Sequence, residues 1–330
     1  MPRKHERLQK STITKCSLSR CSIFFLKFDR DYGLGVLKGK AEMQEAKPDV
    51  IKVIVSHDVD HLYPKDHWLR DLFFPKLWVR TTMQLIKKKI TCREWWLRIT
   101  SCFRKTLNNL DAIMDFDEAH GIQSTFFFGM NQGLGMSYRP EEAKSMIMRV
   151  SERGFSVGVH GIEYKDMLGM KKEYDTFKQI AGFEPSGIRM HYVRFDEKTF
   201  DRLSEVGYAF DTTEFDKPNC GTRKAPYKVG NMWEFPLAIM DSYLPEKLEA
   251  AKQSTLKYLE KCSEQKLQYV TVLFHDYQYC KEYNDMMNWY EWLMEYFEKS
   301  KRYAFASYES IIQELGVYTP DAVLKNNRIQ

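Results

Sequence analysis

Two aspartates that lie two residues apart, directly after an apolar run, are the strongest chemical signal in this sequence. The run covers residues 51–55, and the carboxylates are Asp58 and Asp60. Side chains at positions i and i+2 of a strand point to the same side, so both carboxylates are expected to face one site. A fold tolerates two carboxylates this close when a metal ion or another cation lies nearby. An Asx-rich turn that closes the strand is the alternative interpretation.

Three further strand-like runs carry polar residues at their ends. Residues 154–160 end on His160, residues 187–190 contain Arg189, and residues 270–275 end on His275. α/β folds place their active sites at the carboxyl ends of their parallel strands. Runs that carry Asp, His, Arg and His in turn therefore predict one shared site at that edge of the sheet.

The order and spacing of these segments resemble the polysaccharide deacetylase family, also called the NodB-homology family or carbohydrate esterase family 4. The resemblance covers most of the chain, from about residue 52 to residue 307. Asp58 and Asp60 resemble its first motif, and His160 matches the first histidine of its second motif. Residues 189–192 resemble its Arg-x-Pro-Tyr motif, and residues 273–275 resemble its Leu-x-His motif.

The resemblance implies an enzyme that removes an acetyl group from an amino sugar, or cleaves a related C–N amide bond. It implies that Asp58 is the catalytic base and that Arg189 orients this base and keeps it ionised. The backbone N–H of Tyr192 would face the developing oxyanion. His275 would protonate the departing amine, a role that suits a group titrating near neutral pH.

The resemblance also implies a divalent metal, and zinc is the expected ion because an aspartate oxygen and an imidazole suit it. Asp60 and His160 are the expected ligands. The family's second motif has another histidine three or four residues later, which this sequence lacks. Three residues remain as alternatives for the third ligand: Glu163, Tyr164 and His191, which stands where the family has proline. A site that holds its metal loosely or not at all is the other alternative.

The alternation of strand and helix patterns predicts a parallel sheet, and the resemblance specifies a deformed (β/α) barrel of the NodB type. We expect a basic N-terminal extension at residues 1–48, the barrel at residues 49–318 and a C-terminal tail at residues 319–330. A long helical insertion, residues 62–120, follows the first strand. The Pro- and Gly-containing segment 211–241 predicts a loop-rich insertion that shapes the substrate cleft.

The insertion interleaves aromatic and basic residues at helical spacing between positions 68 and 105. Its aromatic residues are Trp68, Phe73, Phe74, Trp78, Trp95, Trp96 and Phe103. Such a segment could lie on an anionic membrane surface as an amphipathic helix. Alternatively, the rings pack onto the barrel and the charges face water, which we favour because aromatic-rich helices are usually part of a core. Nucleic acid is not an expected partner, because no RNA-binding signature accompanies the segment.

Composition describes an ordinary globular protein with a mild net charge of +5. Seven cysteines without a Cys-x-x-Cys pair favour reduced thiols, and the apolar patch at residues 23–26 is too short for a signal-peptide core. We therefore expect a cytoplasmic protein, peripheral to the inner membrane face if the insertion binds lipid. The expected partner is an acetylated amino-sugar glycan or lipid-linked precursor of the bacterial cell envelope. The rival hypothesis is a catalytically silent glycan-binding or scaffold protein that kept the barrel and lost its metal.

Overall fold

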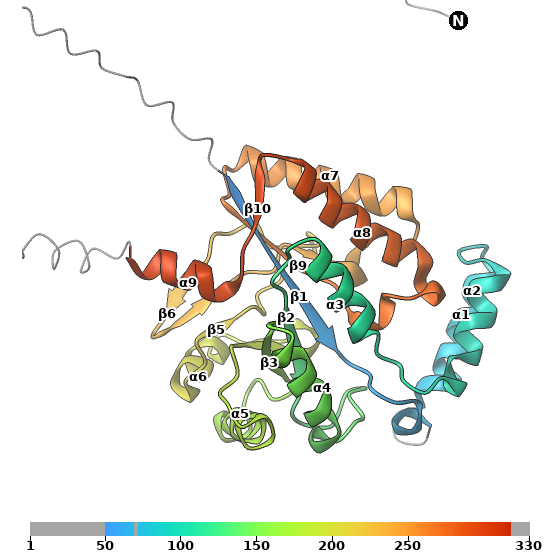
Figure 1. Cartoon of the computed structure of the whole chain (residues 1–330), viewed down its shortest axis with the longest axis horizontal. Coiled ribbons are helices and arrows are strands. Elements are labelled where there is room, and N and C mark those ends of the chain that lie inside the picture. Colours follow the sequence, from blue (N-terminus) through green and yellow to red (C-terminus); the bar gives the residue numbers. More distant parts are fainter. Residues whose placement is uncertain (1–49, 69–71, 318–330) are drawn as a thin grey trace, which may run out of the picture. The chain divides into compact units, whose positions relative to one another are not determined.

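A curled, largely parallel sheet organises the computed structural model, which describes residues 50–68 and 72–317 (Figure 1). The strands of this described part are β1 (Ile51–Val59), β2 (Thr125–Gly129), β3 (Ser156–Gly161), β4 (Ile188–Met190), β5 (Phe210–Asp211), β6 (Tyr227–Val229), β7 (Met232–Glu234), β8 (Ile239–Met240), β9 (Tyr269–Leu273) and β10 (Tyr303–Phe305). They follow the order β6-β7-β5-β4-β3-β2-β1-β9-β8, and β10 pairs with the start of β1. Only the β6–β7 pairing is antiparallel among them. The predicted α/β class and deformed barrel are confirmed.

Helices alternate with the strands and surround the sheet (Figure 1). They are α1 (Phe73–Ile86), α2 (Cys92–Thr100), α3 (Leu110–Ala119), α4 (Pro140–Glu152), α5 (Met167–Ala181), α6 (Thr199–Val206), α7 (Leu248–Glu264), α8 (Asn284–Lys299) and α9 (Tyr308–Val317). None of the helices in the described ranges is long and apolar enough to cross a membrane. The expected N-terminal extension and C-terminal tail lie outside the described residues.

Strand β1 separates two hydrophobic clusters by alternating its side chains. Val53 and Val55 belong to the large cluster between the sheet and its helices. Ile54 belongs to a smaller cluster on the other side of the sheet, to which α9 contributes Tyr308 and Ile311. Because the alternation continues along the nine residues of β1, even-numbered residues face the inside of the curled sheet.

His57 illustrates the same alternation, since it points outward between β1 and its covering helices. Its Nε2 lies 3.0 Å from Asp117 of α3, and its Nδ1 lies 2.9 Å from the carbonyl oxygen of Phe274. The Tyr290 hydroxyl of α8 donates to the same aspartate at 2.6 Å. His57 is therefore a buried structural histidine, turned away from Asp58.

The insertion after β1 forms a helical hairpin, α1–α2, that leaves the barrel and returns to the same place. The backbone N–H of Leu107 donates to the carbonyl oxygen of Leu62 at 2.9 Å, so the two ends of the insertion are tied together. Phe74, Cys102 and Leu107 form a small hydrophobic cluster separate from the main core. Helix α3, which follows, is the barrel helix between β1 and β2.

The segment expected to be a loop-rich insertion instead continues the sheet through the short strands β6, β7 and β8. It also buries two acids opposite each other, Asp211 of β5 and Glu234 of β7. Burial disfavours their charged forms, which raises the pKa of Asp211 to about 6 and the pKa of Glu234 well above its usual range. These strands are two or three residues long, too short for a periodic signal in the sequence.

Candidate active site

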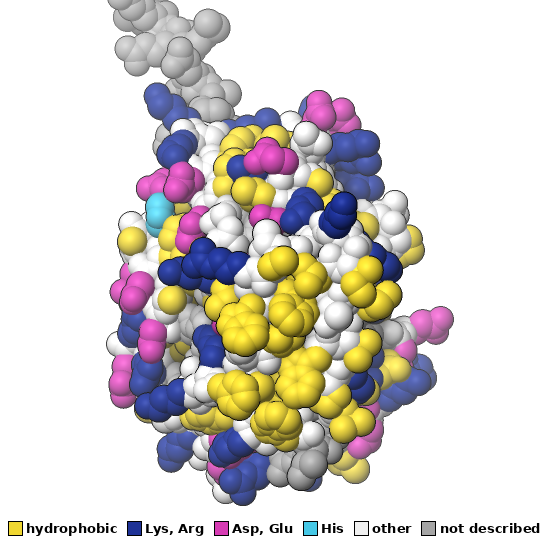
Figure 2. Space-filling model, turned by 90° about the vertical axis from the view of Figure 1, so that its right-hand side faces the viewer, with side chains coloured by type: hydrophobic (Ala, Val, Ile, Leu, Met, Phe, Trp, Pro, Cys, Tyr) yellow, Lys and Arg dark blue, Asp and Glu magenta, His cyan; other side chains and the backbone are white. Residues whose placement is uncertain are grey.

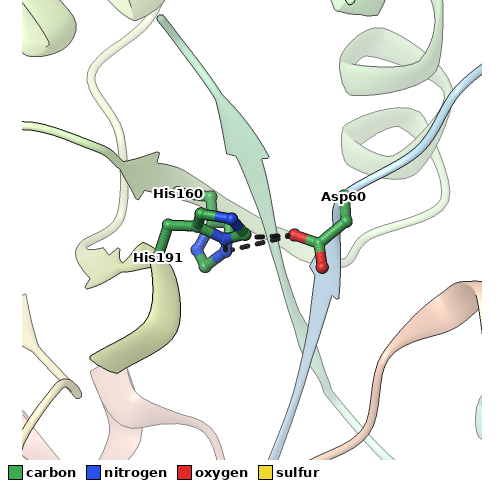
Figure 3. A group of neighbouring side chains, drawn as sticks. All are labelled: Asp60, His160 and His191. Carbon is green, nitrogen blue, oxygen red and sulfur yellow. Dashed lines mark hydrogen bonds and ion pairs between the residues drawn. The ribbon is translucent and has the colours of Figure 1, made fainter. Parts of the chain in front are cut away.

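The carboxyl ends of β1, β3 and β4 bring together Asp60, His160 and His191 (Figure 3). The register of the parallel strands explains why these side chains lie close together. Gly129 of β2 is aligned with His160 of β3, and His160 is aligned with Arg189 of β4. Nε2 of His160 lies 3.3 Å from Oδ1 of Asp60, and Nδ1 of His191 lies 3.5 Å from the same oxygen. One ligand atom from each of the three residues lies within 4.8 Å of the others.

In His160 and His191, the ring nitrogen that points away from Asp60 is hydrogen-bonded to a backbone carbonyl oxygen. Nδ1 of His160 is 3.0 Å from the carbonyl oxygen of Arg189, and Nε2 of His191 is 3.2 Å from that of Leu134. A carbonyl only accepts, so each of these nitrogens carries the proton in the neutral ring. The inner nitrogens, 2.9 Å apart, are then both left with lone pairs.

A third lone-pair donor faces the same point. Oδ1 of Asp60 is buried without a hydrogen-bond partner among the described residues. Without a cation, the protonated forms of His191 and His160 outweigh burial and hold the pKa of Asp60 well below its usual value, and Asp58 and Asp60 in turn raise the pKa of His160. A bound metal ion would take the place of these protons and leave the inner nitrogens with their lone pairs. Two imidazole nitrogens and a carboxylate oxygen around one position fit a divalent cation, and catalytic zinc sites use this number and type of protein ligand.

Asp58 lies beside this group and forms a buried ion pair with Arg189. Nη1 of Arg189 donates to Oδ1 of Asp58 at 2.8 Å, and Nη2 donates to the Ser56 hydroxyl at 2.7 Å. Arg189 is fully buried. Burial alone would raise the pKa of Asp58, but the Arg189 guanidinium together with His160 and His275 outweighs burial and lowers it. Oδ2 of Asp58 remains directed to the site, 3.6 Å from Nε2 of His160.

His275 reaches the site from the end of β9 and is held by Asp241, which the sequence analysis did not identify. Oδ1 of Asp241 accepts from Nδ1 of His275 at 2.7 Å, and Oδ2 accepts from the His275 backbone N–H at 2.7 Å. Burial disfavours the imidazolium, but the Asp241 carboxylate, together with Asp60 and Asp58, outweighs burial and raises the pKa of His275 to about 10. The other nitrogen, Nε2, lies 3.8 Å from Asp60. His275 is therefore protonated at neutral pH, and its Nε2–H group points toward the site.

Asp276, the neighbour of His275 in the chain, does not orient it. Oδ2 of Asp276 accepts from the backbone N–H of Asn109 at 3.1 Å, at the start of α3. Burial raises the pKa of Asp276 to about 8. The orienting carboxylate comes instead from the residue after β8, which pairs with β9 in the sheet.

The other two residues considered as third metal ligands have different contacts. Glu163 accepts hydrogen bonds from the backbone N–H groups of Lys165 and Asp166, at 2.9 and 3.1 Å. The Tyr164 ring lies against the Lys165 ammonium and the Arg194 guanidinium. Neither residue joins the group formed by Asp60, His160 and His191.

Tyr192 lies at the rim of the site, in a left-handed backbone conformation with φ of 58°. Its hydroxyl donates to the carbonyl oxygen of Leu134 at 3.0 Å, and its ring is packed against that of His191. The Lys217 ammonium donates to the Tyr192 carbonyl oxygen at 3.0 Å. An open groove of about 440 Å³ adjoins this position. It is lined by Tyr164, Val193, Arg194, Phe195, Phe215, Asp216, Lys217 and Pro218.

Comparison with known proteins identifies the fold. No family model and no curated protein matches the chain. A protein assigned as a polysaccharide deacetylase in Mycobacterium smegmatis has a TM-score of 0.54 at 15% identity, covering 82% of this chain and 93% of the other. Puue allantoinase has a TM-score of 0.57 at 13% identity, covering 82% and 92%. A protein assigned as a polysaccharide deacetylase in Pseudomonas aeruginosa PAO1 has a TM-score of 0.52 at 11% identity, covering 82% and 93%. The chain therefore has the NodB-type fold of the polysaccharide deacetylases.

Proposed function

We propose that this protein is a metal-dependent hydrolase that removes an acetyl group, or cleaves a related C–N amide bond, from an amino sugar. The observation that carries the proposal is the group of lone-pair donors formed by Asp60, His160 and His191. It lies between an ionised carboxylate, Asp58, and a protonated imidazole, His275. Amide hydrolysis needs these two groups, because water must lose a proton and the leaving amine must gain one.

Asp60, His160 and His191 would hold the metal, and the acid and imidazole donors fit zinc. When bound, zinc polarises the acyl carbonyl and makes water more acidic. The site then lacks one histidine of the family's second motif but gains one from the next strand. His191 takes the position of the proline in the Arg-x-Pro-Tyr motif, and its Nδ1 faces His160.

The protein's own groups then move two protons. Asp58 takes a proton from the attacking water, and Arg189 holds this carboxylate in its ionised form and in place. His275 gives the proton on Nε2 to the leaving amine, and Asp241 fixes the orientation of its ring through Nδ1. The backbone N–H of Tyr192 stabilises the oxyanion in this scheme.

The substrate in this proposal is an acetylated amino-sugar glycan, or a lipid-linked precursor, of the bacterial cell envelope. The two neighbours assigned as polysaccharide deacetylases support a glycan. The open groove beside Tyr192 supports an extended substrate, because the exposed Phe195 ring in its lining offers a flat surface to a sugar ring. We place the protein in the cytoplasm, with no nucleic-acid partner.

Two measurements on one preparation test the function. After dialysis against zinc and removal of free metal, elemental analysis should find close to one zinc per chain, and the His160→Ala and His191→Ala variants should lose it. His120→Ala is the matched control, because His120 bonds to Glu298 at the surface, outside the site. The zinc-loaded parent should release acetate from an N-acetylated amino-sugar oligomer.

Three results would contradict the assignment in different ways. Zinc content that is low and equal in all variants would refute the metal site. Zinc binding without release of acetate, or of any product of C–N cleavage, would refute the enzyme. Binding of the glycan without turnover, with or without zinc, would establish the rival function of a catalytically silent glycan-binding protein.

A further inference from the structure

Exposed apolar side chains concentrate on the α1–α2 hairpin and the segments at its two ends. Of the fourteen large hydrophobic residues that are exposed in the described part of the chain, seven lie between positions 68 and 103. These seven are Trp68, Leu72, Val79, Met83, Ile86, Trp96 and Phe103. Single exposed apolar residues are normal, but a contiguous group marks a surface that another phase or molecule covers.

Spacing places four members of this group on one side of α1. Leu72, Val79, Met83 and Ile86 are separated by seven, four and three residues, which is one stripe along α1. Val79 and Ile86 are each 68% exposed. Figure 2 shows hydrophobic side chains gathered on the face of the molecule that carries the hairpin, with Lys and Arg around them. The aromatic residues were expected to pack as core, but of the seven only Phe74 is buried, Phe73, Trp78 and Trp95 are half-buried, and the others are exposed.

The charge of the hairpin is strongly positive. Residues 72–105 contain nine Lys and Arg residues and one Glu, a net charge of +8, whereas the whole chain carries +5. The single acid, Glu94, is buried in the N-terminal cap of α2, where it bonds to Thr91. The exposed cations are Lys76, Arg80, Lys87, Lys88, Lys89, Arg93 and Lys105.

We propose that the α1–α2 hairpin docks on an anionic lipid surface. Aliphatic side chains such as Val79 and Ile86 gain from entering the boundary of the acyl chains, and the surrounding cations gain from anionic headgroups. Charge decides against a second copy of the chain, because a symmetric contact would place two segments of +8 against each other. Neither helix is long enough to cross a bilayer, so the hairpin lies in the interface.

The hairpin and the candidate active site lie at the same end of the barrel. A chain of ring contacts joins them: His275 to Tyr277 at 5.7 Å, Tyr277 to His61 at 5.3 Å, and His61 to Phe73, the first residue of α1, at 4.7 Å. Five more of the fourteen exposed apolar residues follow the carboxyl ends of β2, β3 and β4. These are Leu134, Met167, Leu168, Tyr192 and Phe195.

When the hairpin is docked, the opening of the candidate active site therefore faces the lipid headgroups. Docking itself does not depend on the proposed function. The preference for a lipid-linked glycan over a soluble one does rest on that function, because it requires the site to be a deacetylase-like centre.

Co-sedimentation of the full-length protein with vesicles tests the docking. We expect binding to vesicles of phosphatidylcholine with phosphatidylglycerol, weaker binding to phosphatidylcholine alone, and loss of the difference in high salt. The double variant Val79→Gln and Ile86→Gln should bind anionic vesicles roughly tenfold more weakly or worse. Leu256→Gln on α7 is the matched control, because Leu256 is exposed on a helix outside the hairpin.

A second pair of variants tests the charge. Lys87 and Arg93 are exposed cations of the hairpin, and replacing both by Gln should lower partitioning into anionic vesicles roughly 25-fold, about fivefold for each charge removed. Replacing Lys257 and Lys301 by Gln removes the same charge elsewhere and should change only the weak long-range attraction. Circular dichroism of each variant establishes that the fold is intact.

The outcomes separate the docking from the chemistry. Absence of binding to either vesicle, or equal and salt-insensitive binding to both, would overturn the proposal. Self-association of the parent that is lost in the Val79 and Ile86 variant would overturn it in favour of a dimer interface. Asp60→Asn should bind vesicles like the parent, so a failure of the metal centre leaves the docking result unaffected.

Discussion

Asp241 keeps His275 protonated, and its replacement by Asn should shift the pH at which activity is lost. The carboxylate accepts two hydrogen bonds from His275, both at 2.7 Å, and raises the pKa of the imidazole to about 10. In Asp241→Asn the pKa should return toward its ordinary value of about 6.5. The general acid would then be almost fully protonated at pH 8 in the parent, but only about 3% protonated in the variant, which predicts a rate roughly 30-fold lower. At pH 5.5 both imidazoles are protonated, so the two rates should nearly agree.

The measurement is the pH dependence of acetate release by the zinc-loaded proteins between pH 5.5 and 9. An NMR titration of the His275 imidazole gives a readout that does not depend on turnover. Asp276→Asn is the matched control, because Asp276 bonds to Asn109 rather than to His275. Parallel profiles for parent and Asp241→Asn, or an unchanged His275 titration, would refute the reasoning.

Three further changes test other parts of the structure. Asp58→Asn should abolish turnover and retain zinc, because Asp58 is not in the ligand group; loss of zinc from this variant would contradict the division of roles. His275→Ala should lose roughly 10²–10⁴-fold in rate, the usual contribution of a general acid, and a parent-like rate would exclude it from that role. Glu234→Gln should increase the free energy of unfolding, measured in urea, at pH 8. The sign follows because burial and the Asp211 carboxylate opposite raise the pKa of Glu234 well above its usual 4.5, so keeping Glu234 protonated in the fold costs stability as the pH rises above about 4.5, and Gln removes this titration. Little difference should remain at pH 4, and a uniform effect at both pH values would show that the cause is packing.

The meeting of Asp58, Asp60, His160, Arg189 and His275 could be predicted from the sequence. Each residue follows or ends an apolar run, and parallel strands gather their carboxyl ends at one edge. Alternation along β1 correctly placed both aspartates on one side, since His160 lies within 3.6 Å of each. The choice of His191 among three candidate ligands needed the structure, because it depends on the turn that follows β4.

Asp241 could not be predicted, because its element leaves almost no pattern. Strand β8 is two residues long and lies in a segment with several prolines and glycines. Its pairing with β9 is a long-range event, and this pairing alone brings Asp241 to His275. Sequence signals that depend on periodicity do not detect strands of this length.

The exposure of the α1–α2 hairpin is a second feature that could not be predicted from the sequence. Its pattern of rings and charges fits both core packing, which the sequence analysis favoured, and exposure, because helical spacing places apolar residues on one face without specifying what covers that face. The structure buries Phe74 and exposes Trp96 and Phe103. Only the positions of neighbouring elements decide between these two outcomes.

The hydrogen bond between Leu107 and Leu62 has an architectural consequence. Because the chain leaves and returns at one point, the α1–α2 hairpin is an excursion from the barrel with a hydrophobic cluster separate from the main core, and it bonds back to the chain through Arg98 and Arg104 to Glu282. A short turn between the two leucines would close the barrel without it, and the same hairpin could be grafted after the first strand of another barrel. The proposed membrane docking and the proposed chemistry would then belong to separable parts of one polypeptide.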